Sequence, residues 1–524
     1  MDVRLEQGLR ELHAAETGPG VRLEDAPLRV SLVYPSPYHV AMSSLGYLQI
    51  HRLANARPGT RCERAMVPDA AQRAIHERTR TPLLTVETRR PAGDADVIAL
   101  SLAYELELAG VVHALNMCGT EPLARDRGGR DPLVVLGGPI TFSNPLPAGP
   151  FADVVLLGEA EATLERLLDL LEERPEAARG DGRARRAVLE QLASEPGFYV
   201  PALHGERLPA IAQAPDDRLP AVSHLFTPNT ELASMQLIEP ERGCHRGCTF
   251  CVMRRSTNGG MRLVAPDRVA TLVDPHVEKV GLVGAAVTDH PRIKDILRDL
   301  IDVQGKRVGV SSLRADRLDD EMVGLLARGG YRSMTVALDA ASERLRDEIE
   351  KNLKIRHVER ATQLAKAHGM RHLKVYVVVA LPGETEEDLD ELVELLVSLS
   401  RTLPVVAALS PFVPKFHTPL ARAPFAGEAA AARAIRHVKR GVKGRVKVRG
   451  PGGREAYVEY RLAQGGHQHA EAAIAAAEQG ATLGVWKRAL AGLPERVTVT
   501  DDLVPQATLR RRWHLKNAGL ARTA

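Results

Sequence analysis

The sequence predicts an α/β protein made of two successive strand–helix units, and three observations support this fold class. Short apolar runs alternate with amphipathic stretches, first over residues 29–171 and again over residues 235–411. Such alternation is typical of parallel βαβ units with right-handed crossovers. Three cysteines follow the first apolar run of the second unit. Chemistry in parallel α/β folds gathers at the carboxyl ends of the strands, so we expect a functional site there.

Length and composition narrow the class of protein. At roughly 150 residues per domain, a chain of 524 residues should form about three domains. The apolar share of 44% is ordinary for a soluble protein. The N-terminus lacks the apolar stretch of a signal peptide, and no run approaches the roughly 20 apolar residues that span a bilayer. The formal charge of +4 is too small to imply a nucleic-acid partner by itself. We therefore expect a cytoplasmic protein with no membrane partner.

The second unit supplies six expected strands and the helices between them. The strands are expected at Met235–Ile238, Lys279–Gly284, Arg307–Val310, Ser333–Leu338, Leu373–Ala380 and Pro404–Leu409. The helices are expected at Pro291–Val303, Asp319–Arg328, His357–Ala367 and Glu386–Leu399. Six such repeats suit an open (β/α)6 barrel, which is part of a TIM barrel.

The first unit shows a flavodoxin-like pattern. Its buried strands are expected at Arg29–Tyr34, Asp96–Leu102, Pro132–Leu136 and Asp153–Leu157, with helices at Glu105–Met117 and Ala160–Leu171. Short turns that contain glycine, at residues 137–139 and 158–159, follow the last two strands.

These patterns divide the chain into four expected parts. Residues 1–173 form the flavodoxin-like domain and residues 232–450 the barrel. Between them, residues 174–231 mix a charged helix with proline-rich turns, and we expect a linker that packs on the barrel. Residues 451–524, which carry the alanine-rich stretch His469–Glu478, should form a small C-terminal α/β extension.

The cysteines Cys244, Cys248 and Cys251 are spaced C-x3-C-x2-C and are the strongest chemical signal in the chain. Thiolates select zinc, copper or iron–sulfur clusters, and a four-iron cluster takes four ligands. Three cysteines leave one iron atom open, and an open coordination position is typical of a catalytic metal site. The alternatives are a half-built zinc site or three unrelated cysteines. Zinc motifs mostly add a second ligand pair, and none is evident here. Cys62 and Cys118 stand apart, so there is no disulfide framework, and a reducing cytosol is expected.

This spacing, with the aromatic Phe250 just before the last cysteine, resembles the signature of the radical S-adenosylmethionine (SAM) superfamily. The resemblance implies a [4Fe-4S] cluster on Cys244, Cys248 and Cys251, with SAM on the fourth iron atom. It also implies reductive cleavage of SAM to methionine and a 5′-deoxyadenosyl radical, with an electron from a donor such as flavodoxin or ferredoxin. The (β/α)6 partial barrel is the core fold of that superfamily.

The resemblance further implies SAM contacts after the second and third strands. Many members carry Gly-Gly-Glu after the second strand to hold the SAM amino group. Residues 284–289 read Gly-Ala-Ala-Val-Thr-Asp, so only Asp289 offers a carboxylate there. After the third strand, Ser312 is expected to meet the ribose and Arg314 the methionyl carboxylate. Alternatively, Arg314 pairs with Asp316 or Asp319 at the surface.

Further contacts are implied after the fourth and fifth strands. Asp339 stands where the family's turn carries glutamate, and residues 380–385 resemble its Gly-Leu-Pro-Gly-Glu-Thr turn near adenine, which makes Gly383 and Glu384 candidates. The structural alternatives are helix caps. Asp339 and Ser342 would cap a helix over residues 343–350, and Thr385 with Asp388 would form a variant capping box.

The first unit resembles the cobalamin (B12)-binding domain often fused in front of radical SAM barrels. That domain's cobalt-ligating motif is D-x-H-x-x-G; here His39 lacks both the aspartate and the spacing. Cobalamin could bind without a lower ligand at the Ser101, Gly137 and Gly138 positions, or the domain has kept the fold and lost the cofactor. Several runs between residues 34 and 419 look like one uncharacterised subgroup of such fused proteins. Its run over residues 412–419 suggests a lid with Lys415 and His417 reaching inward, or a seal at the barrel edge.

Three functions remain open on the sequence. The first is a radical SAM enzyme that abstracts hydrogen from an unknown substrate, with methyl transfer favoured if cobalamin binds. The second is an RNA-modifying radical SAM enzyme, in which the basic stretch 433–449 contacts phosphates; a solvated surface is the alternative. Methylthiotransferases also carry a second cluster on three further cysteines, which this chain lacks. The third is a non-catalytic iron–sulfur scaffold or redox sensor.

Overall fold

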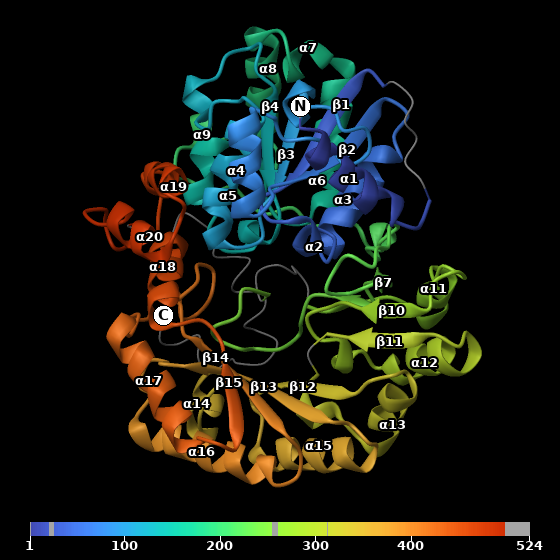
Figure 1. Ribbon diagram of the computed structural model, residues 1–524, viewed down its shortest axis with the longest axis vertical. Helices are drawn as coiled ribbons and strands as arrows, with labels where there is room; N and C mark the ends of the chain where they lie inside the picture. The colour runs from blue at the N-terminus through green and yellow to red at the C-terminus, as the bar shows by residue number, and fades with distance from the viewer. Residues whose placement is uncertain (1, 20–25, 254–259, 312, 498–524) are drawn as a thin grey trace. The chain divides into compact units, whose positions relative to one another are not determined.

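The computed structural model describes residues 2–19, 26–253, 260–311 and 313–497 (Figure 1). These residues divide into two compact units. The first comprises residues 2–235 together with 461–497, and the second comprises residues 236–460. In the described ranges no helix combines the length and apolar character needed to cross a membrane.

The first unit is built on a six-stranded sheet with the order β2-β1-β3-β4-β5-β6. Strands β1 to β5 pair in parallel, and β6 pairs antiparallel with β5. This is the flavodoxin-like order, in which the chain reverses direction across the sheet between β1 and β3. The strands are β1 Leu28–Tyr34, β2 Thr60–Met66, β3 Val97–Ser101, β4 Leu133–Gly137, β5 Val154–Leu156 and β6 Phe198–Tyr199.

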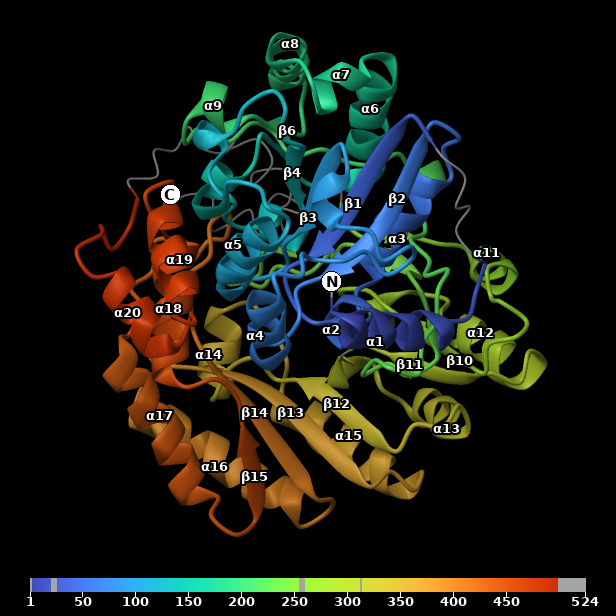
Figure 2. The same ribbon diagram turned by 45° about the horizontal axis from the view of Figure 1, so that its top comes forward.

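Helices cover both faces of this sheet (Figure 2). Alternate residues of each strand point to opposite faces, and Val97 and Leu133 lie in one core cluster with α3 and α6. Their neighbours Ile98 and Val134 are equally buried and face the other side, which α5 covers. The helices of this unit include α1 Val3–Ala14, α3 Leu45–Asn55, α4 Ala70–Thr79, α5 Leu108–Met117, α6 Ala160–Glu173, α8 Gly182–Ala193, α19 His469–Glu478 and α20 Leu483–Ala489.

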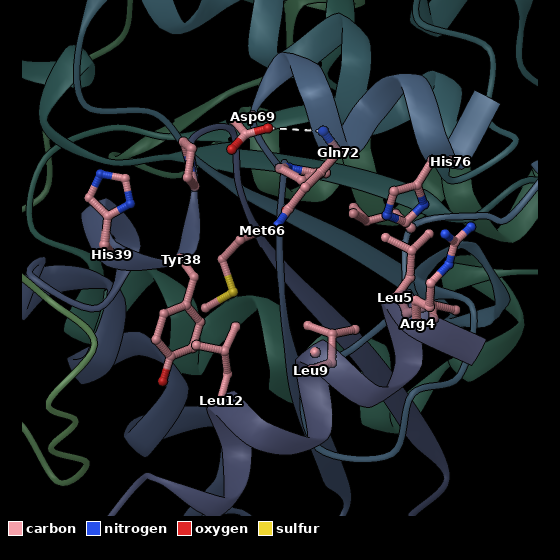
Figure 3. Close-up of a pocket in the computed structure, with 15 residues that line it drawn as sticks. Arg4, Leu5, Leu9, Leu12, Tyr38, His39, Met66, Asp69, Gln72 and His76 are labelled. Carbon is pink, nitrogen blue, oxygen red and sulfur yellow. Dashed lines mark hydrogen bonds between the residues drawn. The ribbon is translucent and has the colours of Figure 1, made fainter. Parts of the chain in front are cut away.

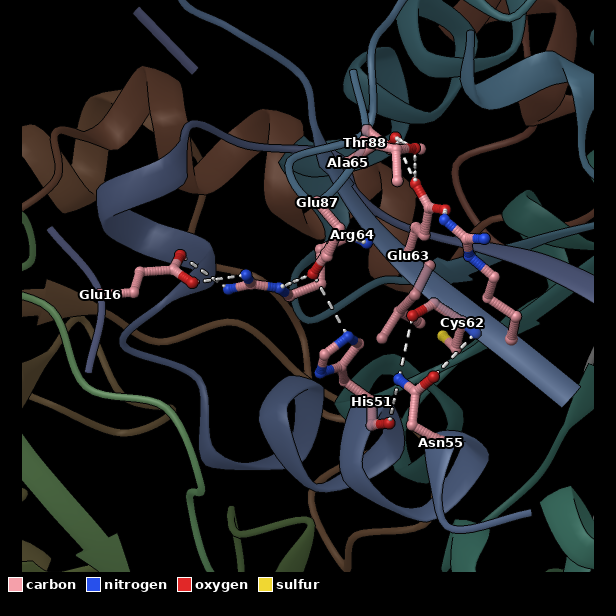
Figure 4. A network of polar contacts seen from close by, with 12 residues as sticks. Glu16, His51, Asn55, Cys62, Glu63, Arg64, Ala65, Glu87 and Thr88 are labelled. Atoms are coloured by element: carbon pink, nitrogen blue, oxygen red, sulfur yellow. Dashed lines mark hydrogen bonds and ion pairs between the residues drawn. The ribbon is translucent and has the colours of Figure 1, made fainter. Parts of the chain in front are cut away.

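Strand β2 was not expected from the sequence, because its residues are mostly polar. All seven are nevertheless buried, and a network of charges accounts for this (Figure 4). The guanidinium of Arg64 lies between Glu16 and Glu87, with Nη2 and Nε each 2.6 Å from a carboxylate oxygen. His51 Nε2 lies 3.4 Å from the Glu87 carboxylate. Buried charges of opposite sign are tolerated when they are paired in this way.

Residues 174–231 belong to the first compact unit, whereas the sequence analysis assigned them to a linker that packs on the barrel. Strand β6, within this segment, pairs with β5, and α8 contributes Val188 and Leu192 to the core. Residues 461–497 return to the same unit, where α19 packs against α5. The side-chain amide of Asn144 donates hydrogen bonds to the backbone carbonyls of residues 463 and 465, at 3.1 and 2.7 Å. Compact units need not be independent folding domains, so the four-part division of the chain stays a prediction.

The second unit contains a β11-β10-β7 sheet and a β12-β13-β14-β15 sheet. A single parallel bridge between Leu313 and Val336 links β12 to the chain after β11. Spatial order therefore follows chain order from β7 to β15, as in a partial barrel, and the α/β fold class is confirmed. Strand β15 adds a parallel strand beyond the six that were expected. The strands are β7 Met235–Ile238, β10 Lys279–Leu282, β11 Arg307–Val310, β12 Ser333–Ala337, β13 His372–Val379, β14 Val405–Pro411 and β15 Val446–Arg449.

The helices of the second unit follow these strands, and most lie within a few residues of their expected positions. They include α11 Pro266–Thr271, α12 Ile293–Arg298, α13 Asp320–Arg328, α14 Glu343–Glu348, α15 Ile355–Ala367, α16 Glu386–Ser400, α17 Glu428–Gly441 and α18 Gly453–Ala463. Helix α12 continues as a π-helical turn over Asp299–Val303.

Candidate active site

The cysteine loop begins at the carboxyl end of β7. Just before it, β8 Glu241–Arg242 pairs antiparallel with β9 Arg262–Leu263. The two ends of the cysteine loop are therefore joined by this short strand pair. Cys248 is buried, whereas Cys244 and Cys251 are partly exposed, and none of the three forms a disulfide. The location agrees with the expectation that chemistry gathers at the strand ends.

Two distant segments hold the described part of this loop. The Thr249 N–H donates to the Ile349 carbonyl at 3.0 Å, and the Leu420 N–H donates to the Thr249 carbonyl at 3.3 Å. The Cys248 thiol lies 3.9 Å from the carbonyl of Glu350. The loop is thus fixed by the turn that follows α14 and by the segment after β14.

An ion-pair cluster ties the loop to the end of β10. Arg246, between the first two cysteines, places Nε 2.7 Å from Asp289, and Arg317 Nε lies 2.9 Å from the same carboxylate. The Asp289 side chain is 0% exposed. Burial alone would raise the pKa of Asp289, but Arg246 and the other arginines around it outweigh burial and lower it. Because arginines engage both oxygens, Asp289 fixes the cysteine loop; its expected contact with the SAM amino group stays a prediction.

Glu241 is a site residue that sequence reasoning missed. Its carboxylate accepts the Ala286 N–H at 2.7 Å, and a side chain added at Gly284 would come within 2.2 Å of it. Its Oε2 has no hydrogen-bond partner among the described residues. Burial raises the pKa of Glu241 to about 7. This buried carboxylate contacts the backbone of residues 284–286, where the superfamily resemblance implies a Gly-Gly-Glu motif. In the sequence, Glu241 is indicated only by its place three residues before Cys244.

Arg314 is buried and paired with Asp316, its Nε lying 3.0 Å from the carboxylate. This matches the ion-pair alternative, although the pair lies inside the fold and not at the surface. Arg314 also donates from Nη2 to the Lys351 carbonyl at 3.3 Å, so its guanidinium already has partners. The candidate Ser312 lies outside the described residues. Its neighbour Ser311 donates to the Gly284 carbonyl at 2.9 Å.

Asp339 has a left-handed backbone, with φ +65°. Its carboxylate is ion-paired with the buried Lys351, which lies in the same turn that holds Cys248. Asp339 is also close enough to Cys251 to raise the pKa of that thiol, although burial is the larger cause. The helix cap is supplied by Ser342, whose hydroxyl accepts the Leu345 N–H at 3.2 Å. Asp339 therefore faces the cysteine loop, whereas Ser342 caps α14.

The turn after β13 brings Gly383 and Glu384 to the carboxyl edge. Glu384 accepts the Ala380 N–H at 2.6 Å, and both Ala380 and Gly383 have positive φ. Burial raises the pKa of Glu384 to about 7, and its Oε2 has no partner in the described ranges. Thr385 and Asp388 form the expected capping box of α16.

The expected lid run, residues 412–419, closes on its own unit. The Phe412 N–H donates to the Val379 carbonyl at 2.8 Å, and Lys415 Nζ lies 2.7 Å from Glu459 of α18. His417 is buried. These contacts favour a seal of the barrel edge over a lysine that reaches a substrate. Phe250 is partly buried beside Cys251 in the loop.

The three thiols are of the ligand type that iron–sulfur clusters take, and in a four-iron cluster each thiolate binds a different iron atom. Within the described ranges, no group of three His, Cys, Asp or Glu side chains is placed to hold one metal ion. Burial and then the neighbouring thiols Cys248 and Cys244 raise the pKa of Cys251 to about 12. A thiol in these surroundings loses its proton only when a cation stabilises the thiolate, and binding of a metal group supplies that cation.

The strand ends at which cobalamin could bind make contacts within the first unit. At the reversal between β1 and β3, Glu107 accepts hydrogen bonds from Ser36 Oγ at 2.7 Å and the Ala103 N–H at 2.9 Å. A side chain at Gly138 would lie 2.5 Å from the Leu102 carbonyl, so that glycine packs closely on backbone. His39 is exposed. Cobalamin binding by these residues stays a prediction.

Comparison with known proteins agrees with the cysteine motif. Residues 238–396 match the family described as the radical SAM superfamily, and residues 46–201 match the family described as radical SAM proteins, N-terminal. An uncharacterized protein of Methanocaldococcus jannaschii is 28% identical over 341 residues, which are 62% of this chain and 67% of that protein. A tRNA-2-methylthio-N(6)-dimethylallyladenosine synthase of Nitratiruptor is 26% identical over 172 residues, 29% of this chain and 40% of the synthase.

Among solved structures, the cobalamin-dependent SAM radical enzyme OxsB with aqua-cobalamin bound is 14% identical, with a TM-score of 0.46. That similarity covers 75% of this chain and 54% of the other, and a score of this size supports no conclusion about function. The sequence matches and the three cysteines on the loop after β7 are independent of it. On both grounds, the chain is an enzyme that contains a radical SAM superfamily domain at residues 238–396, and residues 46–201 form the N-terminal domain found in such proteins.

Proposed function

We propose that Cys244, Cys248 and Cys251 bind a [4Fe-4S] cluster and that the enzyme abstracts hydrogen from its substrate. The observation that carries this proposal is the position of the three thiols. They share one loop at the carboxyl end of β7, and polar side chains from the ends of β10, β11, β12 and β13 accompany that loop.

With the cluster bound, one electron from a donor such as flavodoxin or ferredoxin would split SAM into methionine and a 5′-deoxyadenosyl radical, which becomes 5′-deoxyadenosine on taking hydrogen. The protein's part is binding and orientation. Asp289 and Arg246 hold the loop, and Glu241 fixes the backbone of residues 284–286. Asp339 and Glu384 then stand at the strand ends as the SAM-facing candidates. Free cysteines throughout the chain suit a reducing cytosol.

The test is formation of 5′-deoxyadenosine by the anaerobically reconstituted protein under reducing conditions. Cys248→Ala should abolish it. Cys118→Ala is the matched control, because Cys118 lies on the first unit outside the motif and should leave the rate unchanged. Absence of 5′-deoxyadenosine from the unaltered protein would reject the proposal, as would activity in Cys248→Ala.

A second candidate, RNA modification, is favoured by one feature of the barrel's last helix and strand. Eight cations of α17, β15 and the turn between them are exposed, and none of their side chains makes an ion pair or hydrogen bond with a described residue. They are Arg433, Arg436, Lys439, Arg440, Lys443, Arg445, Lys447 and Arg449. The structural alternative is that charges on the edge strand β15 only prevent strand-to-strand aggregation. A relative that is a tRNA-modifying synthase adds weight to the RNA candidate.

Filter binding of tRNA over a range of salt concentrations distinguishes RNA binding by these cations from a role in preventing aggregation. Phosphate contacts make the logarithm of the binding constant fall with the logarithm of salt, by about 0.7–0.9 per contact. Arg436→Gln/Arg440→Gln should therefore reduce that slope by about 1.4 to 1.8, whereas Arg183→Gln/Arg186→Gln on α8 should not. Equal slopes in the two variants would remove the RNA candidate.

A further inference from the structure

The depression beneath helix α1 of the first unit, shown in Figure 3, is accounted for by contacts within that unit. Leu9 and Tyr38 on its lining pack against the core. Its charged side chains already have partners, because Arg4 Nη2 lies 3.1 Å from the Asp2 carboxylate and Asp69 caps α4. The strands of the second unit differ, since they carry cations that have no acidic partner.

The β12-β13-β14-β15 sheet has one buried face and one open face. Successive side chains of a strand point to opposite faces of the sheet. On β13, every second residue from Leu373 to Val379 is at most 1% exposed, whereas the residues between them are partly exposed. The same alternation runs through β12, β14 and β15. Helices α16 and α17 pack against this sheet, and Figure 1 shows the helices outside the strands. The open face is therefore the inner face of the partial barrel.

The inner face of these four strands carries three cations, namely Lys374, Lys447 and Arg449. No aspartate or glutamate occurs anywhere in the described strands β7 and β10 to β15. The interior of a parallel barrel is normally filled by layers of branched apolar side chains. Three cations in that place, with no carboxylate on the strands around them, indicate an anionic ligand. The other inner-face residues of the four strands are Ser333, Thr335, Ala337, His372, Tyr376, Val378, Val406, Ala408 and Ser410.

The register of the strands places the cations on both sides of β14. Val406 pairs with Lys374 on one side and with Lys447 on the other. Two residues further along, Tyr376 and Arg449 flank β14 in the same way. Neighbouring strands lie about 4.8 Å apart, so the backbones of Lys374 and Lys447 are about 10 Å apart. A phosphate or diphosphate group above β14 is thus within reach of long side chains from both neighbouring strands.

Lys374 is the cation that protection of a sheet edge does not explain. Charges that prevent strand-to-strand aggregation belong on edge strands such as β15, whereas β13 has a partner strand on each side. Lys374 Nζ donates to Tyr376 Oη at 2.8 Å and lies 4.6 Å from the centre of the Tyr376 ring. Tyr376 therefore orients the ammonium group and leaves its charge in place. The side chains of Lys447 and Arg449 make no ion pair or hydrogen bond within the described ranges.

We propose that the inner face of β13, β14 and β15 binds phosphate groups of the enzyme's substrate. Arg449 supplies a planar pair of donors for phosphate oxygens, and Lys374 and Lys447 supply point charges. Arg449 is the last residue of β15, and the carboxyl ends of parallel strands lie at one edge of a barrel. The phosphate is thus held on the side from which the cysteine loop starts. This inference rests on the proposed function, because it names the chemical class of the molecule that loses hydrogen.

The probe is inorganic pyrophosphate, measured by isothermal titration calorimetry on the full chain. The unaltered protein should bind it, and Lys374→Met/Lys447→Met should weaken binding at least about tenfold, because hydrogen bonds between charged groups are lost. Lys439→Met/Lys443→Met is the matched control. It removes two exposed charges from α17 and the turn after it, and screening by salt should limit its effect to less than about threefold. Equal losses in the two variants, or no binding by the unaltered protein, would overturn the proposal.

The variants should fold, because methionine keeps the apolar stem of lysine and neither Lys374 nor Lys447 is buried. Arg449→Gln is a further variant at an exposed position, and it should weaken pyrophosphate binding about tenfold by itself. Unchanged affinity in Arg449→Gln would also overturn the proposal.

Competition against pyrophosphate identifies the source of the phosphate. Displacement by ribose 5-phosphate would indicate a small phosphorylated substrate, and displacement only by a single-stranded oligoribonucleotide would indicate RNA. Displacement by neither would overturn the proposal. Pyrophosphate binding needs neither the cluster nor SAM, so its absence is distinguishable from failure of the proposed function, which is seen as absence of 5′-deoxyadenosine.

Discussion

Asp289→Asn is the perturbation that most directly tests how the fold holds the cysteine loop. The substitution keeps the shape of the side chain and removes its charge. The Asp289 side chain is completely buried, and its carboxylate lies 2.7 Å from Arg246 Nε and 2.9 Å from Arg317 Nε. Hydrogen bonds to charged groups contribute about 1.5–3 kcal/mol, and leaving one partner of a buried pair costs about 3–5 kcal/mol. Asparagine retains an acceptor and Arg317 is half exposed, so we expect a loss of about 2–3 kcal/mol.

If that loss acts on the competent conformation of the loop, it lowers the active fraction roughly 30-fold to 140-fold, at tenfold per 1.4 kcal/mol. The assays are iron bound per chain after anaerobic reconstitution and the rate of 5′-deoxyadenosine formation. Asp295→Asn is the control, because Asp295 also pairs with two arginines but lies 40% exposed on α12. Exposed pairs contribute about 0–1 kcal/mol, so the control should keep most of its activity. Equal behaviour of the two variants would refute the reasoning.

Three further predictions concern stability and are measured by thermal unfolding. Burial raises the pKa of Glu384 to about 7, well above the ordinary range of a glutamate, so the folded state keeps a proton that the unfolded state has released, and stability falls as pH rises toward and through 7. Glu384→Gln cannot ionise and should gain about 1 kcal/mol relative to the unaltered protein between pH 6 and pH 8; a constant difference would contradict this. Gly138 has φ +106° and would place a Cβ 2.5 Å from a carbonyl, so Gly138→Ala should cost about 3 kcal/mol or more. Gly137→Ala, with its nearest contact at 3.8 Å, is the control, and similar losses would contradict the packing argument. Arg64→Met leaves Glu87 buried without its guanidinium and should cost about 3–5 kcal/mol, and a change below about 1 kcal/mol would show that the network does not stabilise β2.

Strands that contain a cluster of neighbouring apolar residues could be predicted from the sequence, whereas two mostly polar strands could not. The bounds of β7 and β11 agree with the expectation to the residue, although β7 contains Gln236 and β11 begins at the exposed Arg307. Strand β2 was missed because it is buried by ion pairs with Glu16 and Glu87, which lie far away in the sequence. Strand β15 was missed because its exposed lysine and arginine suggested a surface segment.

In the candidate site, too, contacts between residues far apart in the sequence could not be predicted. The cysteines could be found because their spacing is local and chemically specific. The bond between Arg246 and Asp289 joins residues 43 positions apart, and no local pattern indicates it. Glu241 was missed for a similar reason, because its role is evident only from its hydrogen bond to the backbone of residues 284–286. Sequence reasoning named the strand ends correctly but could not tell which polar groups there are already paired.

The most direct test of the central claim is electron paramagnetic resonance of the anaerobically reconstituted, reduced protein, recorded with and without SAM. We expect a [4Fe-4S] signal that shifts when SAM is added and that is absent from Cys248→Ala. A signal that does not change when SAM is added would instead indicate an iron–sulfur scaffold or redox sensor. No signal from the unaltered protein would contradict the assignment of the three cysteines.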